Sequence, residues 1–187
     1  MELIKNMKNK TTNVDDAQGV IATQEKQLSI VDTPINARAL YSLRESGYNN
    51  YTAIADIVDN SLDAGVNSKN VYITTSNTKI SISDDGCGMS QEELKSALTL
   101  GPSTKDSTSC LGKYGLGLNL ASTSLGLRVT VITKQKVGDY HIGIYDVDDI
   151  VERAAITGKV SIESGEASDA QVLEFKKATK GAKSGTV

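Results

Sequence analysis

The chain has 187 residues and a formal net charge of −3 at pH 7. This length supports one domain with a single core, and the charge balance, with no basic cluster, gives no electrostatic footprint for nucleic acid. No stretch approaches the length of a membrane span, and the polar N-terminus lacks the apolar run of a signal peptide. The two cysteines, Cys87 and Cys110, are better explained as reduced thiols than as a disulfide framework. We therefore expect a cytoplasmic protein with no membrane partner.

The N-terminal region differs from the rest of the chain. Residues 1–33 are polar and lack strong periodicity, so we expect a loosely ordered extension followed by one domain over residues 34–187. A first helix is expected over residues 38–46. It is followed by a turn at residues 47–50.

Residues 56–64 read Asp-Ile-Val-Asp-Asn-Ser-Leu-Asp-Ala and form the most informative segment of the chain. In a helix over residues 52–64, Asp56, Asn60 and Asp63 occupy positions i, i+4 and i+7, so that Asn60 and Asp63 each point within about 40° of Asp56. Apolar neighbours on the other faces would pack this helix on a sheet. A stripe of two carboxylates and an amide oxygen suits a hydrated Mg²⁺ and a water. The alternative is an ordinary amphipathic helix with a solvated acidic face.

Two alternating runs follow, Val71–Thr75 and residues 79–83. Their period of two predicts half-buried strands that form a hairpin. The second strand ends at Asp84, where residues 84–89 read Asp-Asp-Gly-Cys-Gly-Met. A carboxylate at a strand end, beside a flexible turn, can accept a hydrogen bond from a base amino group in an otherwise apolar pocket. The alternative is a plain surface turn.

A helix is expected over residues 91–100, because Ser90 and Glu93 carry the signature of a capping box. Residues 101–117 follow as a loop with several Ser, Thr and Gly residues, suited to disorder without ligand. It ends in Gly-Lys-Tyr-Gly-Leu-Gly at residues 112–117, where main-chain amides can approach phosphate oxygens ahead of the next helix. It is neither a Walker loop nor a dinucleotide fingerprint. The alternative is a mobile surface loop.

Two further strands are expected over residues 127–133 and 140–147, joined across residues 136–139. His141, the single histidine, lies in the second of these strands. We expect it to be a residue of the strand surface, not a catalytic or phospho-acceptor group.

Together, the three motifs resemble the GHKL superfamily, named after gyrase, the heat-shock chaperones, histidine kinases and MutL. The match covers roughly residues 38–134 and the extreme C-terminus. Residues 51–56 and 100–105 are similar to MORC-like and MutL-like ATPases, and residues 60–65 are similar to the MutL form of the first motif. Residues 115–118 have a histidine-kinase character. The resemblance implies a Bergerat-type ATP-binding fold. That fold is an α+β two-layer sandwich, with a mixed, mainly antiparallel sheet and helices on one face.

The resemblance assigns the chemistry to the first motif. Asp56 matches the general base that polarises the attacking water, where most ATPase members have Glu, and Asn60 matches the Mg²⁺ ligand. Asp is one methylene shorter, so its oxygens fall about 1.5 Å short unless the helix lies closer, and a general base needs hydrogen-bond reach. Asp59 is the second candidate, offset from Asp56 by about 60°. Asp63 is expected to brace the helix and the turn after it.

The other two motifs are assigned to the nucleotide itself. Asp84 matches the carboxylate that accepts from the adenine amino group, and Gly88 and Met89 match the lining of the base pocket. Thr186, in the terminal Gly185-Thr186, matches a hydroxyl that helps to fix adenine, often through water. The residues that match the phosphate-binding lid are Lys105, Gly112, Lys113, Tyr114, Gly115, Leu116 and Gly117.

The implied activity is Mg²⁺-dependent ATP binding, with slow hydrolysis that drives a lid-closure or dimerisation cycle. The alternatives are a regulatory module that holds nucleotide without turnover, and a histidine-kinase-type catalytic domain, which has no need of the acid at position 56. A homodimer, with residues 1–33 as an arm that crosses to the second subunit, is expected by analogy, as is any nucleic-acid partner. We also expect a fragment that lacks the transducer-type domain, which supplies a lysine to the γ-phosphate in ATPase branches.

Overall fold

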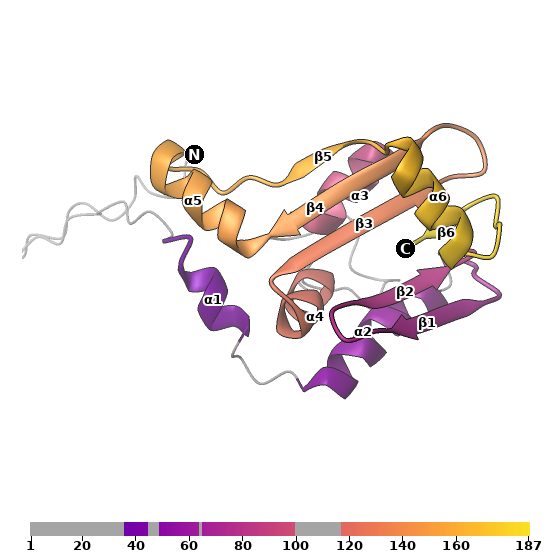
Figure 1. Cartoon of the computed structure of the whole chain (residues 1–187), viewed down its shortest axis with the longest axis horizontal. Coiled ribbons are helices and arrows are strands. Elements are labelled where there is room, and N and C mark those ends of the chain that lie inside the picture. Colours follow the sequence, from indigo (N-terminus) through magenta and orange to yellow (C-terminus); the bar gives the residue numbers. More distant parts are fainter. Residues whose placement is uncertain (1–35, 45–48, 64, 100–116) are drawn as a thin grey trace, which may run out of the picture. The chain divides into compact units, whose positions relative to one another are not determined.

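The computed structural model describes residues 36–44, 49–63, 65–99 and 117–187 (Figure 1). The chain divides into two units, residues 1–34 and residues 35–187, and every described residue belongs to the second. Within the described ranges, no helix has the length and apolar character that a membrane crossing requires.

The described part of this unit is built on one six-stranded sheet, in which every strand pair is antiparallel. In order across the sheet the strands are β1 (Val71–Thr75), β2 (Ile80–Asp84), β6 (Gly185–Thr186), β3 (Arg128–Lys134), β4 (Tyr140–Asp146) and β5 (Glu163–Glu166). The β1–β2 hairpin forms locally, whereas β6 comes from the end of the sequence and is inserted between β2 and β3. Two residues of β6 therefore connect the hairpin to the rest of the sheet.

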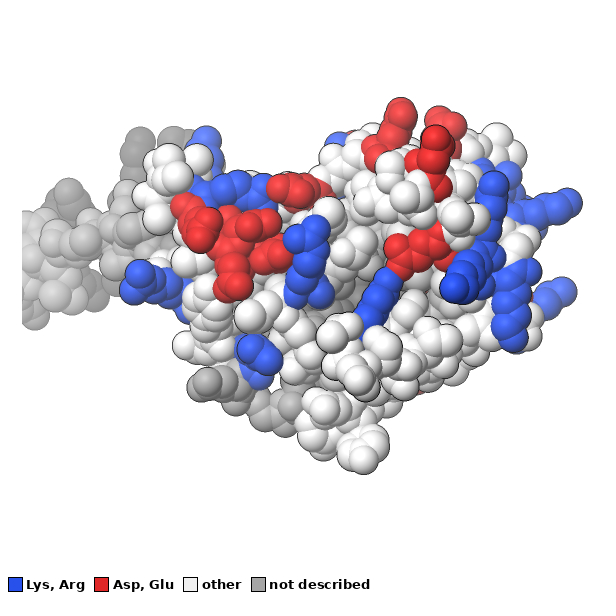
Figure 2. All heavy atoms as spheres, viewed as in Figure 1, with Lys and Arg blue, Asp and Glu red and all other residues white. Residues whose placement is uncertain are grey.

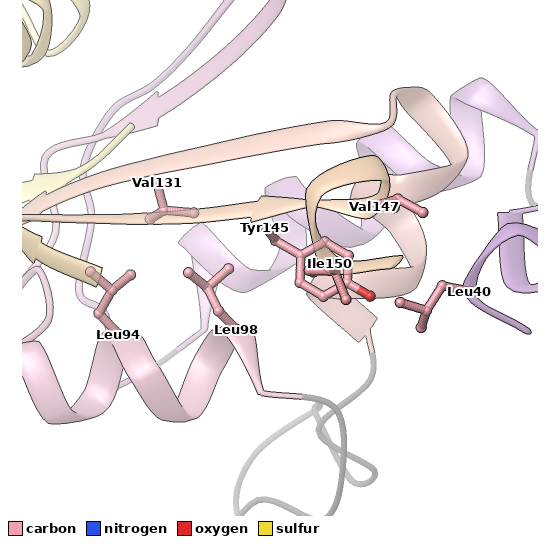
Figure 3. Close-up of a cluster of buried hydrophobic side chains, with 7 residues drawn as sticks. All are labelled: Leu40, Leu94, Leu98, Val131, Tyr145, Val147 and Ile150. Carbon is pink, nitrogen blue, oxygen red and sulfur yellow. The ribbon is translucent and has the colours of Figure 1, made fainter. Parts of the chain in front are cut away.

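Helices α1 to α5 lie on one face of the sheet. The described helices are α1 (Ala39–Arg44), α2 (Asn50–Leu62), α3 (Gln91–Leu98), α4 (Gly117–Leu125), α5 (Val147–Thr157) and α6 (Asp169–Ala178). Side chains of α1, α3, α5 and two strands form the main core cluster (Figure 3): Leu40, Leu94, Leu98, Val131, Tyr145, Val147 and Ile150. Gly143 lets α3 approach β4, because a Cβ there would lie 2.3 Å from Leu98 Cδ1. Each fully buried leucine of this cluster contributes roughly 2 kcal/mol.

Helix α6 packs on the opposite face. Val131 and Ile132 are neighbours in β3, and successive side chains of a strand point to opposite faces. Val131 belongs to the main cluster, whereas Ile132 packs with Ile142 and Phe175 of α6. The fully buried Phe175 ring lies edge-on to Tyr140, with 5.2 Å between ring centroids.

The expected α+β class with a mainly antiparallel sheet is confirmed. Helices α1 to α5 lie on one face of the sheet, as expected. Helix α6 is the exception, because it packs on the apolar residues that β3 and β4 present on the opposite face. Helix α2 begins two residues before the expected start, since Asn49 Oδ1 accepts from the N–H groups of Tyr51 and Thr52 at 3.0 and 2.9 Å. The capping box expected for α3 is present. Helices α5 and α6 and strand β5, which lie within residues 147–178, were not expected from the sequence.

Candidate functional site

Asp84, the last residue of β2, is the buried acid at the centre of the site. The residue is only 5% exposed. Its Oδ1 accepts a hydrogen bond from the Gly86 N–H at 2.9 Å, and its Oδ2 accepts one from the Ser61 hydroxyl at 3.2 Å. Donors from the following turn and from the last turn of α2 therefore hold this carboxylate in place.

Burial raises the pKa of Asp84 above its ordinary value of 3.8, and hydrogen bonds from Gly86, Ser61 and the Thr186 backbone oppose that rise. A carboxylate that has lost most of its water gains from any further N–H donor. The position therefore suits an acceptor for an exocyclic amino group of a nucleotide base.

The two glycines after Asp84 allow the turn to pass close to neighbouring segments. A Cβ on Gly86 would lie 2.3 Å from Val66 Cγ1, and one on Gly88 would lie 2.0 Å from the Lys134 carbonyl oxygen. Gly88 also has a φ of 68°, which side chains with a Cβ rarely adopt. The spacing of the two glycines is therefore imposed by packing against β3 and against the loop that precedes β1.

Asp85 has a different role from its neighbour. Its carboxylate accepts from the N–H groups of Lys69 and Asn70 at 2.7 and 2.9 Å and from the Asn70 side-chain amide at 2.7 Å. The side-chain bond from Asn70 is the main cause that lowers the pKa of Asp85. Asp85 thus holds the two residues that precede β1 in place.

Strand β6 brings Thr186 beside Asp84. Thr186 pairs with Asp84 on one side and with Thr133 of β3 on the other, and directly opposed residues share a face of the sheet. The row continues to His141, which pairs with Thr133. The bond from Ser61 to Asp84 shows that this row lies on the face covered by α2. The structure thus brings together the two residues expected to contact the base.

Thr133 connects this row to the glycine turn. The residue is fully buried, and its hydroxyl oxygen accepts the Met89 N–H at 2.8 Å. The same hydroxyl donates to the Gly185 carbonyl oxygen at 3.1 Å and lies 3.2 Å from the Thr186 hydroxyl. Met89 and Thr186, both expected at the base, are therefore joined through one side chain.

Helix α2 presents Asp56 and Asn60 beside its packed ridge. Ala53 and Ser61 are buried and Ile57 is half-buried, and these three residues at i, i+4 and i+8 form the ridge. Asn60 and Asp56 point about 60° and 100° away from Ile57. Asn60 is exposed and Asp56 is half-buried, so both can reach a ligand from solvent. The two residues share a side of the helix, as the spacing predicts.

The other two acids of α2 are placed differently. Asp59 is exposed and points about 160° away from Ile57, which makes it a poorer second candidate for the base. The Asp63 carbonyl oxygen accepts from the N–H groups of Val66 and Asn67 at 2.9 and 3.4 Å, so its main chain closes the turn after α2.

Helix α4, which begins at Gly117, packs against α2. The expected phosphate-binding segment therefore leads into a helix that packs on α2, the helix that carries Asp56 and Asn60. Seven residues named in the sequence analysis lie outside the described residues: Lys105, Cys110, Gly112, Lys113, Tyr114, Gly115 and Leu116.

Sequence reasoning missed Ser61 and Thr133 as parts of the site. A signal existed for Ser61, because it is a small polar residue four positions after Ile57, on the ridge that packs on the sheet. No such signal in the sequence marked Thr133, since threonine is common in strands. His141 was expected at the strand surface, but its Nδ1 is buried and has no hydrogen-bond partner in the described part of the chain. Cys87 is an exposed free thiol.

Charge is unevenly distributed over the described surface (Figure 2). Acidic side chains gather where α5 lies, and this helix exposes Asp148, Asp149 and Glu152. Basic side chains gather near α6 and the turn after it, where the exposed lysines are Lys176, Lys177, Lys180 and Lys183. No basic cluster was expected, and this is corrected here, because these four exposed lysines lie within residues 176–183.

Comparison with known proteins places this geometry in a family. The family model described as "Histidine kinase-, DNA gyrase B-, and HSP90-like ATPase" matches residues 48–181, which contain α2, the glycine turn and Thr133. Strand β6 lies beyond residue 181 and therefore does not contribute to this match.

Curated relatives are found among MORC proteins. The chain is 33% identical over 103 residues to "ATPase morc-1" of Caenorhabditis elegans, covering 54% of this chain and 12% of that protein. It is 33% identical over 94 residues to "MORC family CW-type zinc finger protein 1" of Homo sapiens, covering 46% and 10%. It is 32% identical over 91 residues to "Protein MICRORCHIDIA 6" of Arabidopsis thaliana, covering 45% and 14%.

The chain thus spans about a tenth of the length of these relatives. The family model covers most of the chain and includes the buried Asp84 with its glycine turn. The chain belongs to the histidine kinase-, DNA gyrase B- and HSP90-like ATPase family, as an ATP-binding GHKL domain similar to those of MORC proteins.

Proposed function

We propose that this chain binds ATP together with Mg²⁺ and hydrolyses it slowly, and that nucleotide binding drives a lid-closure or dimerisation cycle. The observation that carries the proposal is the buried Asp84 carboxylate, set beside Thr186 by β6 and held by Ser61 and Gly86. A preformed acceptor with little water around it is what recognition of an amino group requires.

The base end of the site is assigned to the sheet. Asp84 accepts from the adenine amino group, and the Thr186 hydroxyl contacts the neighbouring ring nitrogen directly or through water. Gly88 and Met89 line the pocket. Their N–H and C=O groups lie in a turn that is fixed against β3, since Met89 donates to Thr133 at 2.8 Å.

The metal end is assigned to α2. Asn60 would hold the Mg²⁺ through its amide oxygen, because Mg²⁺ prefers oxygen ligands. Asp56 acts as the general base toward the attacking water. Bound Mg²⁺ supplies neutralisation of phosphate charge, while the chain orients the water and accepts its proton at the Asp56 carboxylate.

The cycle is assigned to residues 101–117, with Lys105 and the glycines of residues 112–117 at the phosphates. Hydrogen exchange across this segment, with and without a non-hydrolysable ATP analogue, tests that assignment. We expect protection to rise when the γ-phosphate engages the segment. Unchanged protection would contradict the proposed lid closure, but it would not contradict the proposal that the chain binds ATP.

Two competing activities make different predictions. A regulatory module without turnover would bind ATP and release no phosphate, and a histidine-kinase-type domain would transfer the γ-phosphate to a histidine. A homodimer that forms with nucleotide, and a nucleic-acid partner, rest on analogy with the relatives. Sedimentation with and without the ATP analogue tests the dimer.

Calorimetry and a steady-state phosphate-release assay test the proposal itself. We expect ATP binding that depends on Mg²⁺, and turnover below about one per minute. Asn60→Ala should remove the metal-dependent part of the affinity, while the exposed Thr52→Ala on the same helix serves as its control. Equal affinity with Mg²⁺ and with EDTA in the wild-type chain would rule out the metal assignment.

A further inference from the structure

Thr133 is a side chain of β3 that contacts both the glycine turn and the terminal strand. Its hydroxyl oxygen is 2.8 Å from the Met89 nitrogen, 3.1 Å from the Gly185 carbonyl oxygen and 3.2 Å from the Thr186 hydroxyl oxygen. The residue is fully buried, so water does not substitute for these partners. Neither the family resemblance nor the sequence motifs singled it out.

The closeness of the two hydroxyls follows from the strand register. Ile132 and Val187 exchange both main-chain hydrogen bonds, at 2.9 and 2.8 Å. The next pair, Thr133 and Thr186, is therefore a non-hydrogen-bonded pair, in which opposed side chains approach each other more closely. The pair after that is Lys134 and Gly185, and the Gly185 carbonyl oxygen also accepts from the Thr133 hydroxyl at 3.1 Å.

A hydroxyl has one proton to donate and two lone pairs. One lone pair of Thr133 accepts the Met89 N–H. Its proton goes to the Gly185 carbonyl oxygen at 3.1 Å, so this one side chain joins the glycine turn to the strand that carries Thr186. If Thr133 were apolar, the buried Met89 N–H would lose its partner, and the terminal strand would lose its side-chain hydrogen bond to β3.

We propose that Thr133 is a positioning residue for base selection: its hydroxyl joins the Met89 turn to the terminal strand and so holds Thr186 beside Asp84, so that the site favours adenine over guanine. The inference rests on the proposed function, because it concerns the base end of the same site. Adenine presents an amino donor next to a ring-nitrogen acceptor, and these match Asp84 as acceptor and Thr186 as donor. Guanine presents the reverse pattern, a carbonyl oxygen next to a ring N–H.

The test measures the affinities for ATP and for GTP, with Mg²⁺, by calorimetry on the whole chain. Thr133→Val keeps the shape of the side chain and removes its hydroxyl. We expect the preference for ATP over GTP to fall about tenfold, because one hydrogen bond is lost and the buried Met89 N–H is left unpaired. Thr133→Ser restores the hydroxyl and should stay within about threefold of the wild type. Thr130→Val makes the same change in the same strand, at an exposed residue on the opposite face, and should leave both affinities unchanged.

The ratio of the two affinities separates positioning from a purely structural role. A residue that only supports the fold would lower the melting temperature and leave the ratio among folded molecules unchanged. An unchanged ratio in Thr133→Val, or an equal fall in Thr133→Ser, would overturn the inference. If Thr133→Val does not fold, Thr133→Cys, whose thiol is a weaker donor than a hydroxyl, is measured instead. An ATP-to-GTP affinity ratio in Thr133→Cys equal to that of Thr133→Ser would then overturn the inference. A wild-type chain that does not prefer ATP would instead contradict the proposed function.

Discussion

The two ends of the site are built in different ways. At the base end, Asp84 and Thr133 are 5% and 0% exposed and are joined by hydrogen bonds to a turn, a helix and a strand. At the α2 end, Asn60 is exposed and Asp56 half-buried, and neither side chain makes a hydrogen bond to another described residue. One end is fixed before a ligand arrives, whereas the other is left open to solvent.

The difference matches the chemistry proposed for each end. Discrimination between bases needs donors and acceptors that cannot move to suit the wrong partner. A hydrated Mg²⁺ and an attacking water need access and space for several waters. We therefore expect affinity and base preference to depend on the sheet, and turnover to depend on α2. The predictions below are ordered from the largest expected effect to the smallest.

Gly88→Ala should have the largest effect, because it damages the preformed end. The new Cβ would meet the Lys134 carbonyl at a φ of 68°, and we expect a loss of at least ~3 kcal/mol in the free energy of unfolding, together with loss of ATP binding. Gly158→Ala is the matched control, since its φ is 69° and no atom lies within 4 Å. It should cost about 1 kcal/mol. Urea unfolding of both variants checks this, and equal losses would mean that the close approach of the turn to β3 is not required.

Asp56→Ala should separate the two ends. ATP affinity should stay within a few-fold of the wild type, while phosphate release falls by ~10²–10⁴-fold, the usual contribution of a general base. Asp59→Ala is the control on the same helix and should leave turnover unchanged, since Asp59 points away from the packed ridge. If Asp56→Ala turns over as fast as the wild type, the base lies elsewhere and Asp59 must be tested first.

Asp84→Asn should weaken ATP binding by at least ~10-fold, because a charge-assisted acceptor is replaced by a group that also presents a donor. Asp85→Asn is the neighbouring control. Its carboxylate is committed to Lys69 and Asn70, so ATP affinity should change little. Calorimetry on both variants decides, and a larger loss in Asp85→Asn would show that the wrong carboxylate has been assigned to the base.

The same two variants should have opposite, small effects on stability. The pKa of Asp84 is raised by burial, so its contribution to stability is present below its ordinary pKa of 3.8 and is lost as the pH rises through the raised value. Asp84→Asn should therefore be more stable relative to the wild type at pH 7 than at pH 4.

The pKa of Asp85 is lowered by Asn70, so its contribution is present above 3.8 and is lost as the pH falls through the lowered value. Asp85→Asn should lose stability at pH 7. Melting temperatures of the two variants between pH 4 and pH 7, without nucleotide, measure both effects. Effects of the same sign would contradict the assignment of one acid to a ligand and the other to the fold.

The sequence was sufficient for local features and not for those that depend on register. The α2 stripe, the capping box of α3 and the glycine turn each follow from spacing within a few residues. Helices α5 and α6 were missed although Asp146 and Ser168 cap them, because no motif drew attention to residues 148–184. The contact between Thr133 and Thr186 could not be predicted, since a shift of one residue in the pairing of β6 with β3 would point one of them to the other face.

The most direct test of the central claim titrates ATP and GTP, each with Mg²⁺, into the Asp56→Ala variant. Without turnover both titrations reach equilibrium, and the α2 carboxylate is absent while the buried row of the sheet is intact. We predict that ATP binds at least ~10-fold more tightly than GTP, as in the wild-type chain. Equal affinities for the two nucleotides would contradict the claim that base recognition is built into the sheet.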